Sequence, residues 1–279
     1  MKQIAKKEKK ARREKRRREA EELGDKAPPK LKPKTLDTLR EPDETFVLPA
    51  DEEVMEDEAA DEFADHYAGK VTPKVMITTN LKATKESYRF IIELARVIPN
   101  STYYGRRSYS LKAIVGYAKN RGFTHLVVVN EDNKKLNGLL VIHLPNGPTA
   151  LFKLSSIALP KQIKGHASMS KHTPELILNN FNTRLGHTVG RLLGSLFPYI
   201  PNFHGRRVIT LHNQRDFIFF RQHRYVFEST EEARLQEMGP QFTLKLRSLQ
   251  HGTFDTKFGE YEFVHKSENR PYARRKFVL

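Results

Sequence analysis

The chain contains no cysteine, no tryptophan and no long apolar run. Without cysteine it forms neither a disulfide nor a thiolate zinc site, which is consistent with a reducing compartment. No apolar stretch approaches the roughly 18 residues that a membrane-spanning helix needs. The basic start, MKQIAKKEKK, leads into no apolar segment, so we do not expect a secretory signal.

Acidic residues are scarce in the larger part of the chain. Residues 70–279 hold 33 Lys/Arg and only 14 Asp/Glu, whereas residues 1–40 hold 16 and 7, and residues 41–69 hold 12 acids and no base. A fold this basic repels itself unless a polyanion lies nearby. We expect that polyanion to be nucleic acid rather than an anionic membrane surface. Charge alone leaves open a basic protein with no nucleic-acid role.

The patterns that mark many enzymes are also missing. Residues 70–279 contain no D-x-D or H-x-D cluster in an apolar setting and no H-x₃-H pair with a nearby carboxylate. No G-K-[ST] follows the glycines at 186, 190 and 194, so they do not form a phosphate-binding loop. The sequence therefore predicts a protein that is not an enzyme and has no metal, cofactor or small-molecule substrate.

The first 69 residues differ from the rest. We expect residues 1–40 to be a basic arm with a proline-rich linker, which either orders on RNA or on a partner, acts as a nuclear import signal or is a disordered tail. We expect residues 41–69 to be an acidic linker. Within it, residues 51–65 carry nine acids. They either fold over a basic surface of their own chain, meet a basic partner or stay solvated.

From residue 71 on, the pattern predicts a folded α/β domain. We expect strands over 75–80, 123–130, 138–145 and 149–156, with helices that begin at Thr84 and Ser110. Thr173 and Pro174 are expected to open a further helix. Helices are predicted over 184–197 and 231–238, and a last strand over 239–249. Gly186, Gly190 and Gly194 share one helix face, where we expect tight packing on the sheet. The alternative is a close approach of the helix backbone to RNA or to a partner.

The segment RRVITLHNQRDFIFFRQHRYVF (206–227) is typical of a β-hairpin, yet it holds five arginines and one acid. Antiparallel pairing places four arginines at its open end, where we predict RNA contacts: Arg206, Arg207, Arg221 and Arg224. Arg215 and Asp216 lie at the turn and are expected to pair. In the alternative, the arginines pair with glutamates just downstream.

Two further segments favour RNA binding. In LKLRSL, Lys245 and Arg247 share one face of a strand. From residue 251 on, aromatic and basic residues interleave, which suits stacking on unpaired bases and contact with phosphates. The candidate residues there are Phe254, Lys257, Phe258, Tyr261, Phe263, His265 and Lys266. Alternatively, the aromatics anchor the segment on the domain and only the bases face outward.

The sequence also repeats itself weakly. GPTALFKLSS (147–156) and GPQFTLKLRS (239–248) match at five of ten positions, and each follows a predicted strand pair. This order predicts two similar α/β halves in one domain.

Several motifs in order resemble the Brix-domain family of ribosome assembly factors. They are TTNLKATKESYRFIIELARVIPNSTYYGR, THLVVVNED, GLLVIHLPNGPTALFKL, the hairpin above and GPQFTLKLRSLQHGTFDTKFGEYEF. The resemblance implies a domain over 70–251 with halves at about 70–160 and 161–251, each similar to the anticodon-binding domain of class II aminoacyl-tRNA synthetases. It also implies that residues 252–279 are an RNA-binding extension.

The resemblance implies a function as well. Such proteins act in the nucleus and nucleolus, bind pre-rRNA within the pre-60S particle and pair with a dedicated protein partner. Their RNA-binding stretch corresponds here to Gly252 through Asn269, including Thr253. Gln241 departs from the arginine that relatives often carry, which makes a phosphate contact there doubtful. The alternative is a protein-interaction adaptor whose basic face docks an acidic partner, with RNA contact incidental.

Overall fold

A computed structural model of the whole chain describes residues 14–15, 34–36, 38–41, 44–48, 51–230, 232–255, 258–265 and 277–279. Two compact units are present, residues 1–39 and residues 40–279. Most of the predicted basic arm lies outside the described residues. In the first unit, Thr35 and Thr38 form a local turn through mutual hydrogen bonds. All that follows concerns the second unit.

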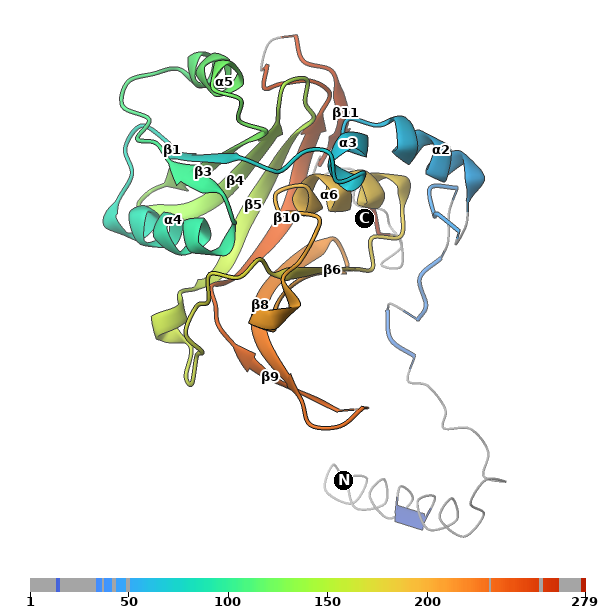
Figure 1. Cartoon of the computed structure of the whole chain (residues 1–279). Helices are drawn as coiled ribbons and strands as arrows, with labels where there is room; N and C mark the ends of the chain where they lie inside the picture. Colours follow the sequence, from blue (N-terminus) through green and yellow to red (C-terminus); the bar gives the residue numbers. More distant parts are fainter. Residues whose placement is uncertain are drawn as a thin grey trace, which may run out of the picture. The chain divides into compact units, whose positions relative to one another are not determined.

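A mixed sheet of 11 strands organises this unit (Figure 1). Its central path runs β2-β1-β3-β4-β5-β10-β8-β7-β6. The strands of the N-terminal half are β1 (Val75–Thr79), β2 (Ser101–Tyr103), β3 (His125–Asp132), β4 (Lys135–His143) and β5 (Thr149–Ala158). Those of the C-terminal half are β6 (Glu175–Asn179), β7 (Arg207–Gln214), β8 (Phe217–Phe227) and β10 (Gln241–Gln250). Two more lie off the path, β9 (Ala233–Glu237) beside β8 and β11 (Tyr261–Val264) beside β10.

The two halves repeat one topology. In each half a parallel pair, β1 with β3 or β6 with β7, is followed by two antiparallel strands. The halves join where β5 pairs antiparallel with β10. These two strands carry the sequence repeat, so the duplication predicted from the sequence is visible in the strand order. The predicted mixed α/β class is confirmed.

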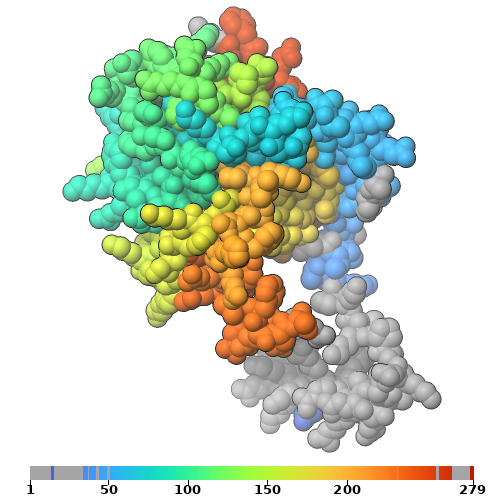
Figure 2. Space-filling view, in the orientation of Figure 1, coloured from blue at the N-terminus to red at the C-terminus, as the bar shows by residue number. Residues whose placement is uncertain are grey.

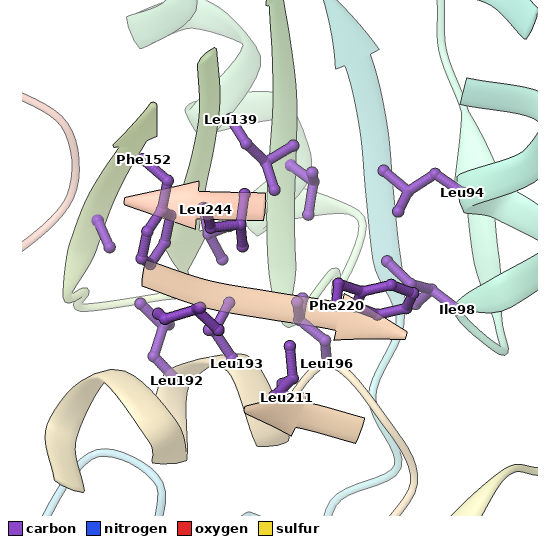
Figure 3. Close-up of a cluster of buried hydrophobic side chains, with 14 of the residues drawn as sticks. Leu94, Ile98, Leu139, Phe152, Leu192, Leu193, Leu196, Leu211, Phe220 and Leu244 are labelled. Carbon is purple, nitrogen blue, oxygen red and sulfur yellow. The ribbon is translucent and has the colours of Figure 1, made fainter. Parts of the chain in front are cut away.

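Helices cover the two faces of the sheet unequally. On one face, α4 (Lys85–Val97) and α6 (Arg184–Gly194) pack over the main core, which spans both halves. Figure 3 shows Leu192, Leu193 and Leu196 pointing toward Phe220 and Leu244 of the sheet. On the other face, α5 (Leu111–Asn120) packs over the N-terminal half alone, with Ile114, Val115 and Ala118 buried. No described helix is long and apolar enough to cross a membrane.

The predicted helix starts at Thr84 and Ser110 are confirmed. Thr84 is the N-cap of α4, and the Ser110 hydroxyl accepts a hydrogen bond from the Ala113 amide at the start of α5. The predicted loop over 100–109 instead contains the short strand β2. It lies parallel to β1 at the edge of the sheet.

Two predicted helices are strands. The helix expected at Thr173 and Pro174 is β6, which pairs parallel with β7, and α6 begins later, after the cap Thr183. The helix expected over 231–238 is β9, paired antiparallel with β8. Both segments are short, and a neighbouring strand supplies hydrogen bonds that local propensity does not anticipate.

The acidic segment is not a linker. It forms α2 (Glu52–Ala60) and α3 (Ala64–Tyr67), and Phe63 between them is 1% exposed within the main core. Two hydrogen bonds, of 2.6 and 2.8 Å, join the Arg191 guanidinium of α6 to the Asp61 carboxylate. Figure 2 shows this blue segment lying against the gold C-terminal half. Of the three alternatives, folding over a basic surface of its own chain is the one observed.

The glycine face of α6 meets other parts of the chain than predicted. A Cβ built on Gly186 would approach Leu279, one on Gly190 would approach Phe181, and one on Gly194 would collide with the Tyr67 hydroxyl. The sheet packs instead against the leucines of α6. The expected packing on the sheet is therefore only partly correct. Gly194 lies near Leu176 of β6, but the closest approaches to the three glycines come from Tyr67 of α3, from Phe181 and from Leu279.

Candidate nucleic-acid interface

One face of the C-terminal half of the sheet is covered by no helix of the described residues. On β8, Ile218, Phe220 and Gln222 are buried, so the residues between them point the opposite way. In the N-terminal half this same face lies under α5. We call the uncovered part the open face. Strand pairing places on it Lys153, Ser155, Thr210, His212, Phe217, Phe219, Arg221, Thr243 and Lys245.

Two lysines oppose each other where the halves meet. Lys153 of β5 and Lys245 of β10 are register partners, and they are also equivalent positions of the sequence repeat. In the part of the chain that the structure describes, neither forms an ion pair. Like charges directly opposite in a sheet are destabilising. A phosphate bound between them would remove that repulsion, so the pair favours an anionic ligand.

Aromatic rings lie beside these cations. The Lys245 ammonium is 4.7 Å from the centroid of the Phe217 ring, and the Arg221 guanidinium is 5.8 Å from that of Phe219. Arg221 also donates a hydrogen bond of 2.8 Å to the Phe220 carbonyl, which fixes its position. A guanidinium has five N–H donors, so most of them stay available to phosphate oxygens. The open face thus combines fixed cations with rings on which bases can stack.

Arg207, in contrast, does not face RNA. Its side chain is buried at 2% exposure and donates to four main-chain carbonyls, those of Ser170, His172, Arg96 and Val97. Burial lowers the pKa of Arg207 to about 10. The prediction that Arg207 contacts RNA is therefore wrong, because strand alternation turns it into the core.

The other predicted hairpin arginines separate as well. Arg224 is exposed and lies on the opposite side of β8 from Arg221, directly across from Arg207. Arg206 is exposed in a left-handed conformation, and its carbonyl accepts a hydrogen bond from the Tyr225 amide. The predicted cluster of four thus becomes Arg221 on the open face and two arginines at the end of the hairpin. At the turn, Asp216 accepts bonds from the Val278 and Leu279 amides.

The C-terminal segment divides into anchors and exposed residues. Phe254 packs on the α5 side of the sheet and Phe263 on the main core, whereas Phe258 is 86% and Tyr261 47% exposed. Leu279 is buried at 1% exposure. Within the described residues of this segment, Phe254, Phe263 and Leu279 therefore anchor it on the domain. Lys257, Lys266 and Asn269 lie outside the described residues.

The remaining predicted residues sit around the end of β10. Arg247 is half-buried at an irregularity in the pairing with β5, and its carbonyl accepts a 2.7 Å hydrogen bond from the His265 amide. Gly252 has a positive φ and its carbonyl accepts from the Thr149 hydroxyl, with Thr253 next to it. Tertiary contacts thus hold Arg247, Gly252, Thr253 and His265 in one region. This region lies next to the open face, because β10 belongs to both.

Sequence reasoning missed Lys153, Phe217 and Phe219 as site residues. A signal exists in the sequence, because alternation in TALFKLSS opposes Lys153 to the buried Phe152 and Leu154. The repeat also aligns Lys153 with Lys245, which the sequence does predict as a contact. What no local pattern indicates is that α5 leaves the C-terminal half uncovered.

The carboxylate Glu131 has a structural role. It accepts hydrogen bonds from the Thr84 amide, the Thr84 hydroxyl and the Ser87 hydroxyl at the start of α4. Desolvation alone would raise the pKa of Glu131, but the bonds from Ser87 and Thr84 outweigh it and lower the pKa. A carboxylate that neutralises a helix N-terminus in this way is a cap.

Comparison with known proteins assigns the fold to a family. The sequence profile of the Brix domain matches residues 81–248, which lie within the range expected from the motifs. The chain belongs to the Brix-domain family. The resemblance seen in its sequence motifs is thereby confirmed.

Relatives of this Brix-domain chain have names that agree with one another. It is 55% identical over 279 residues to "Ribosome production factor 1" of Pongo abelii, covering 100% of this chain and 80% of that protein. It is 52% identical over 208 residues to the Saccharomyces cerevisiae protein of the same name, covering 74% and 69%. A solved probable ribosomal biogenesis protein from Aeropyrum pernix aligns with 62% of this chain and 96% of its own, at TM-score 0.47 and 14% identity.

Proposed function

We propose that this Brix-domain protein is a non-catalytic ribosome biogenesis factor that binds pre-rRNA during assembly of the large (60S) subunit in the nucleolus. Its relatives are ribosome production factors, which supports the process. The observation that carries RNA binding is the open face, with Lys153 and Lys245 opposed where the two halves meet and Arg221 on the neighbouring strand β8. The large subunit and the nucleolus follow from the family resemblance of the motifs.

The chemistry of the open face suits holding RNA rather than cleaving it. Its cations sit on strands at fixed spacing, so they match the phosphates of a backbone laid across the sheet. Two carboxylates lie at its margins and have partners there: Glu175 accepts a hydrogen bond from Tyr225, and Glu237 lies opposite His223. A scaffold that neutralises phosphates in this way holds rRNA segments in place while other factors act.

One observation favours a protein partner as well. Beyond the last pairing with β7, β8 and β9 continue as a two-stranded ribbon that protrudes from the sheet (Figure 1). Val226, Phe227 and Leu235 on this ribbon are 47%, 66% and 61% exposed. Adjacent exposed apolar side chains are typical of protein interfaces. We propose that the dedicated partner docks on this ribbon; in the adaptor alternative it is the only ligand.

Salt dependence of RNA binding tests the proposal. In the double variant Lys153→Ala/Lys245→Ala, the negative slope of log K against log salt should become less steep. The change should be about one unit for each phosphate that the variant no longer neutralises. Lys161→Ala/Lys164→Ala is the matched control, because it removes the same charge from an exposed loop off the open face. An unchanged slope in a folded open-face variant would favour the adaptor.

Crosslinking in cells tests the rRNA assignment. Sequencing of RNA crosslinked to the full chain should recover large-subunit pre-rRNA, and microscopy should place the protein in the nucleolus. Recovery of unrelated transcripts at similar frequency would contradict it. The open-face variant should lose the rRNA signal while the loop control keeps it.

A further inference from the structure

A row of exposed aromatic and basic side chains lies on the α5 side of the N-terminal half, outside the open face. Tyr109 contacts Tyr117 of α5 edge to face, with ring centroids 5.6 Å apart. Tyr117 and Arg121 are four residues apart and therefore neighbours along the helix. The Arg121 guanidinium in turn lies 5.7 Å from the centroid of the Tyr104 ring. We call Tyr109, Tyr117, Arg121 and Tyr104 the tyrosine row.

The fold does not bury the tyrosine row. Tyr104, Tyr109 and Tyr117 are 38%, 47% and 50% exposed, whereas α5 packs on the sheet through other residues. The row nevertheless has a fixed support at one end. Tyr104 rests edge-on against the buried Phe123 ring, at 5.9 Å, and the Lys74 ammonium lies 4.5 Å from that ring. Rings that are held in place while their faces stay accessible are suited to stacking.

The surroundings of the row carry one sign of charge. Between Arg96 and Glu131 the chain holds five further Lys/Arg and no acid. Arg107, Lys112 and Lys119 are exposed on the same loop and helix as the row, and Arg106 is tied to it by a hydrogen bond to the Tyr109 carbonyl. A strand of nucleic acid laid along the row would find cations for its phosphates on these two elements.

We propose that the tyrosine row is a second RNA contact, specific for unpaired nucleotides. Bases stack on Tyr109, Tyr117 and Tyr104, and the guanidinium of Arg121 continues the stack between two rings. Paired bases present no free faces, so a duplex cannot use the row. The inference rests on the proposed function for the class of ligand, RNA. It differs in placing a contact on the N-terminal half and in requiring unpaired nucleotides.

Binding of a short oligouridylate to the full chain tests this inference. Tyr117→Leu should weaken binding about tenfold, because one stacking platform is removed. Tyr117→Phe keeps the ring and should bind like the unmodified chain. Tyr199→Leu is the matched control: Tyr199 is 58% exposed and also makes an edge-to-face contact, with Tyr67, away from the row. Duplex RNA should bind Tyr117→Leu and the unmodified chain equally.

A second readout comes from composition. Because the chain has ten tyrosines and no tryptophan, its fluorescence reports tyrosine directly. Oligouridylate should quench this fluorescence, and Tyr117→Leu should reduce the quenching while Tyr199→Leu leaves it unchanged.

The outcomes separate the two proposals. If Tyr117→Leu and Tyr109→Leu bind oligouridylate as tightly as the unmodified chain does, the tyrosine row is overturned. It is also overturned if these variants lose as much affinity for duplex RNA as for oligouridylate. If that result comes with weakened RNA binding by Lys153→Ala/Lys245→Ala, the proposed function stands without the row. If the unmodified chain binds neither form of RNA, both proposals fall.

Discussion

Arg207 shows how one residue can have the chemistry of a ligand contact and the role of a core residue. A planar guanidinium with five donors can serve four main-chain carbonyls at once. Two of these carbonyls, of Arg96 and Val97, belong to the end of α4, and two to the loop before β6. Arg207 therefore ties the N-terminal half to the C-terminal half.

Replacement of Arg207 tests this role. Arg207→Ala should lower the free energy of unfolding by about 3 kcal/mol or more, because four main-chain carbonyls lose a donor and a buried side chain is removed. Arg224→Ala, at the exposed register partner, should stay within about 0.5 kcal/mol of the unmodified chain. Urea unfolding of both variants measures the difference. Equal stability of the two would show that Arg207 is not a structural residue.

At the scale of elements, α6 is the helix on which the most distant parts of the chain meet. One side holds the leucines of the main core, and another carries Arg184, His187 and Arg191, which pair with acids of α2 and the residues after it. The glycine face lets Tyr67 of α3 approach so closely that its hydroxyl donates to the Arg191 carbonyl, at 3.1 Å. The glycines are thus explained by packing within the chain.

Two glycine substitutions separate packing from helix propensity. Gly194→Ala should destabilise by about 1–3 kcal/mol, because the new methyl group collides with the Tyr67 hydroxyl. Gly116→Ala in α5 meets nothing within 4 Å and should stabilise by about 0.5–1 kcal/mol. Thermal unfolding measures both.

A rescue variant identifies the cause. Removing the hydroxyl with Tyr67→Phe should recover part of the Gly194→Ala loss in the double variant. Strict additivity of the two substitutions would contradict a direct collision.

At the scale of the molecule, three histidines lie where the acidic segment meets the two halves. His66 comes from α3, His125 from β3 and His143 from β4, and the His125 ring bonds to the Ser195 hydroxyl beyond α6 at 2.9 Å. The rings of His125 and His143 are 4.8 Å apart. Burial lowers the pKa of His125, and the nearby His143 and His66 lower it further. Burial also lowers the pKa values of His143 and His66.

Stability should therefore fall on mild acidification. Above the usual histidine pKa of about 6.5, these histidines are neutral in both the folded and the unfolded chain, so their ionisation does not affect the free energy of unfolding. As the pH falls below it, the unfolded histidines take up protons that the folded ones do not, so the free energy of unfolding decreases until the lowered folded pKa values are reached. Melting temperatures between about pH 7.5 and pH 5.5 measure this. His125→Gln should show a shallower decline, and an identical decline would contradict the assignment.

The unequal helix cover of the two halves determines which surfaces are available for ligand binding. Both halves repeat one strand order, but α5 covers only the N-terminal one. The C-terminal half thereby presents its sheet face, whereas the N-terminal half presents the outer surface of α5. The two proposed RNA contacts follow from this single difference.

The sequence by itself determined the family, the mixed α/β class, the basic character and the elements with strong local signals. The helices α4, α5 and α6 have apolar residues at helical spacing, and the β7–β8 hairpin has period two. Such signals lie within one segment, so they can be recognised without the rest of the fold.

Only the tertiary structure decided the rest. β6 and β9 became strands because partner strands complete their hydrogen bonds, and Arg207 became a core residue because register sets which face is buried. The acidic segment became structure because α6 presents its cations to it. The open face exists because α5 packs over the N-terminal half of the sheet alone. Each of these outcomes rests on contacts between separate segments of the chain, which no local pattern encodes.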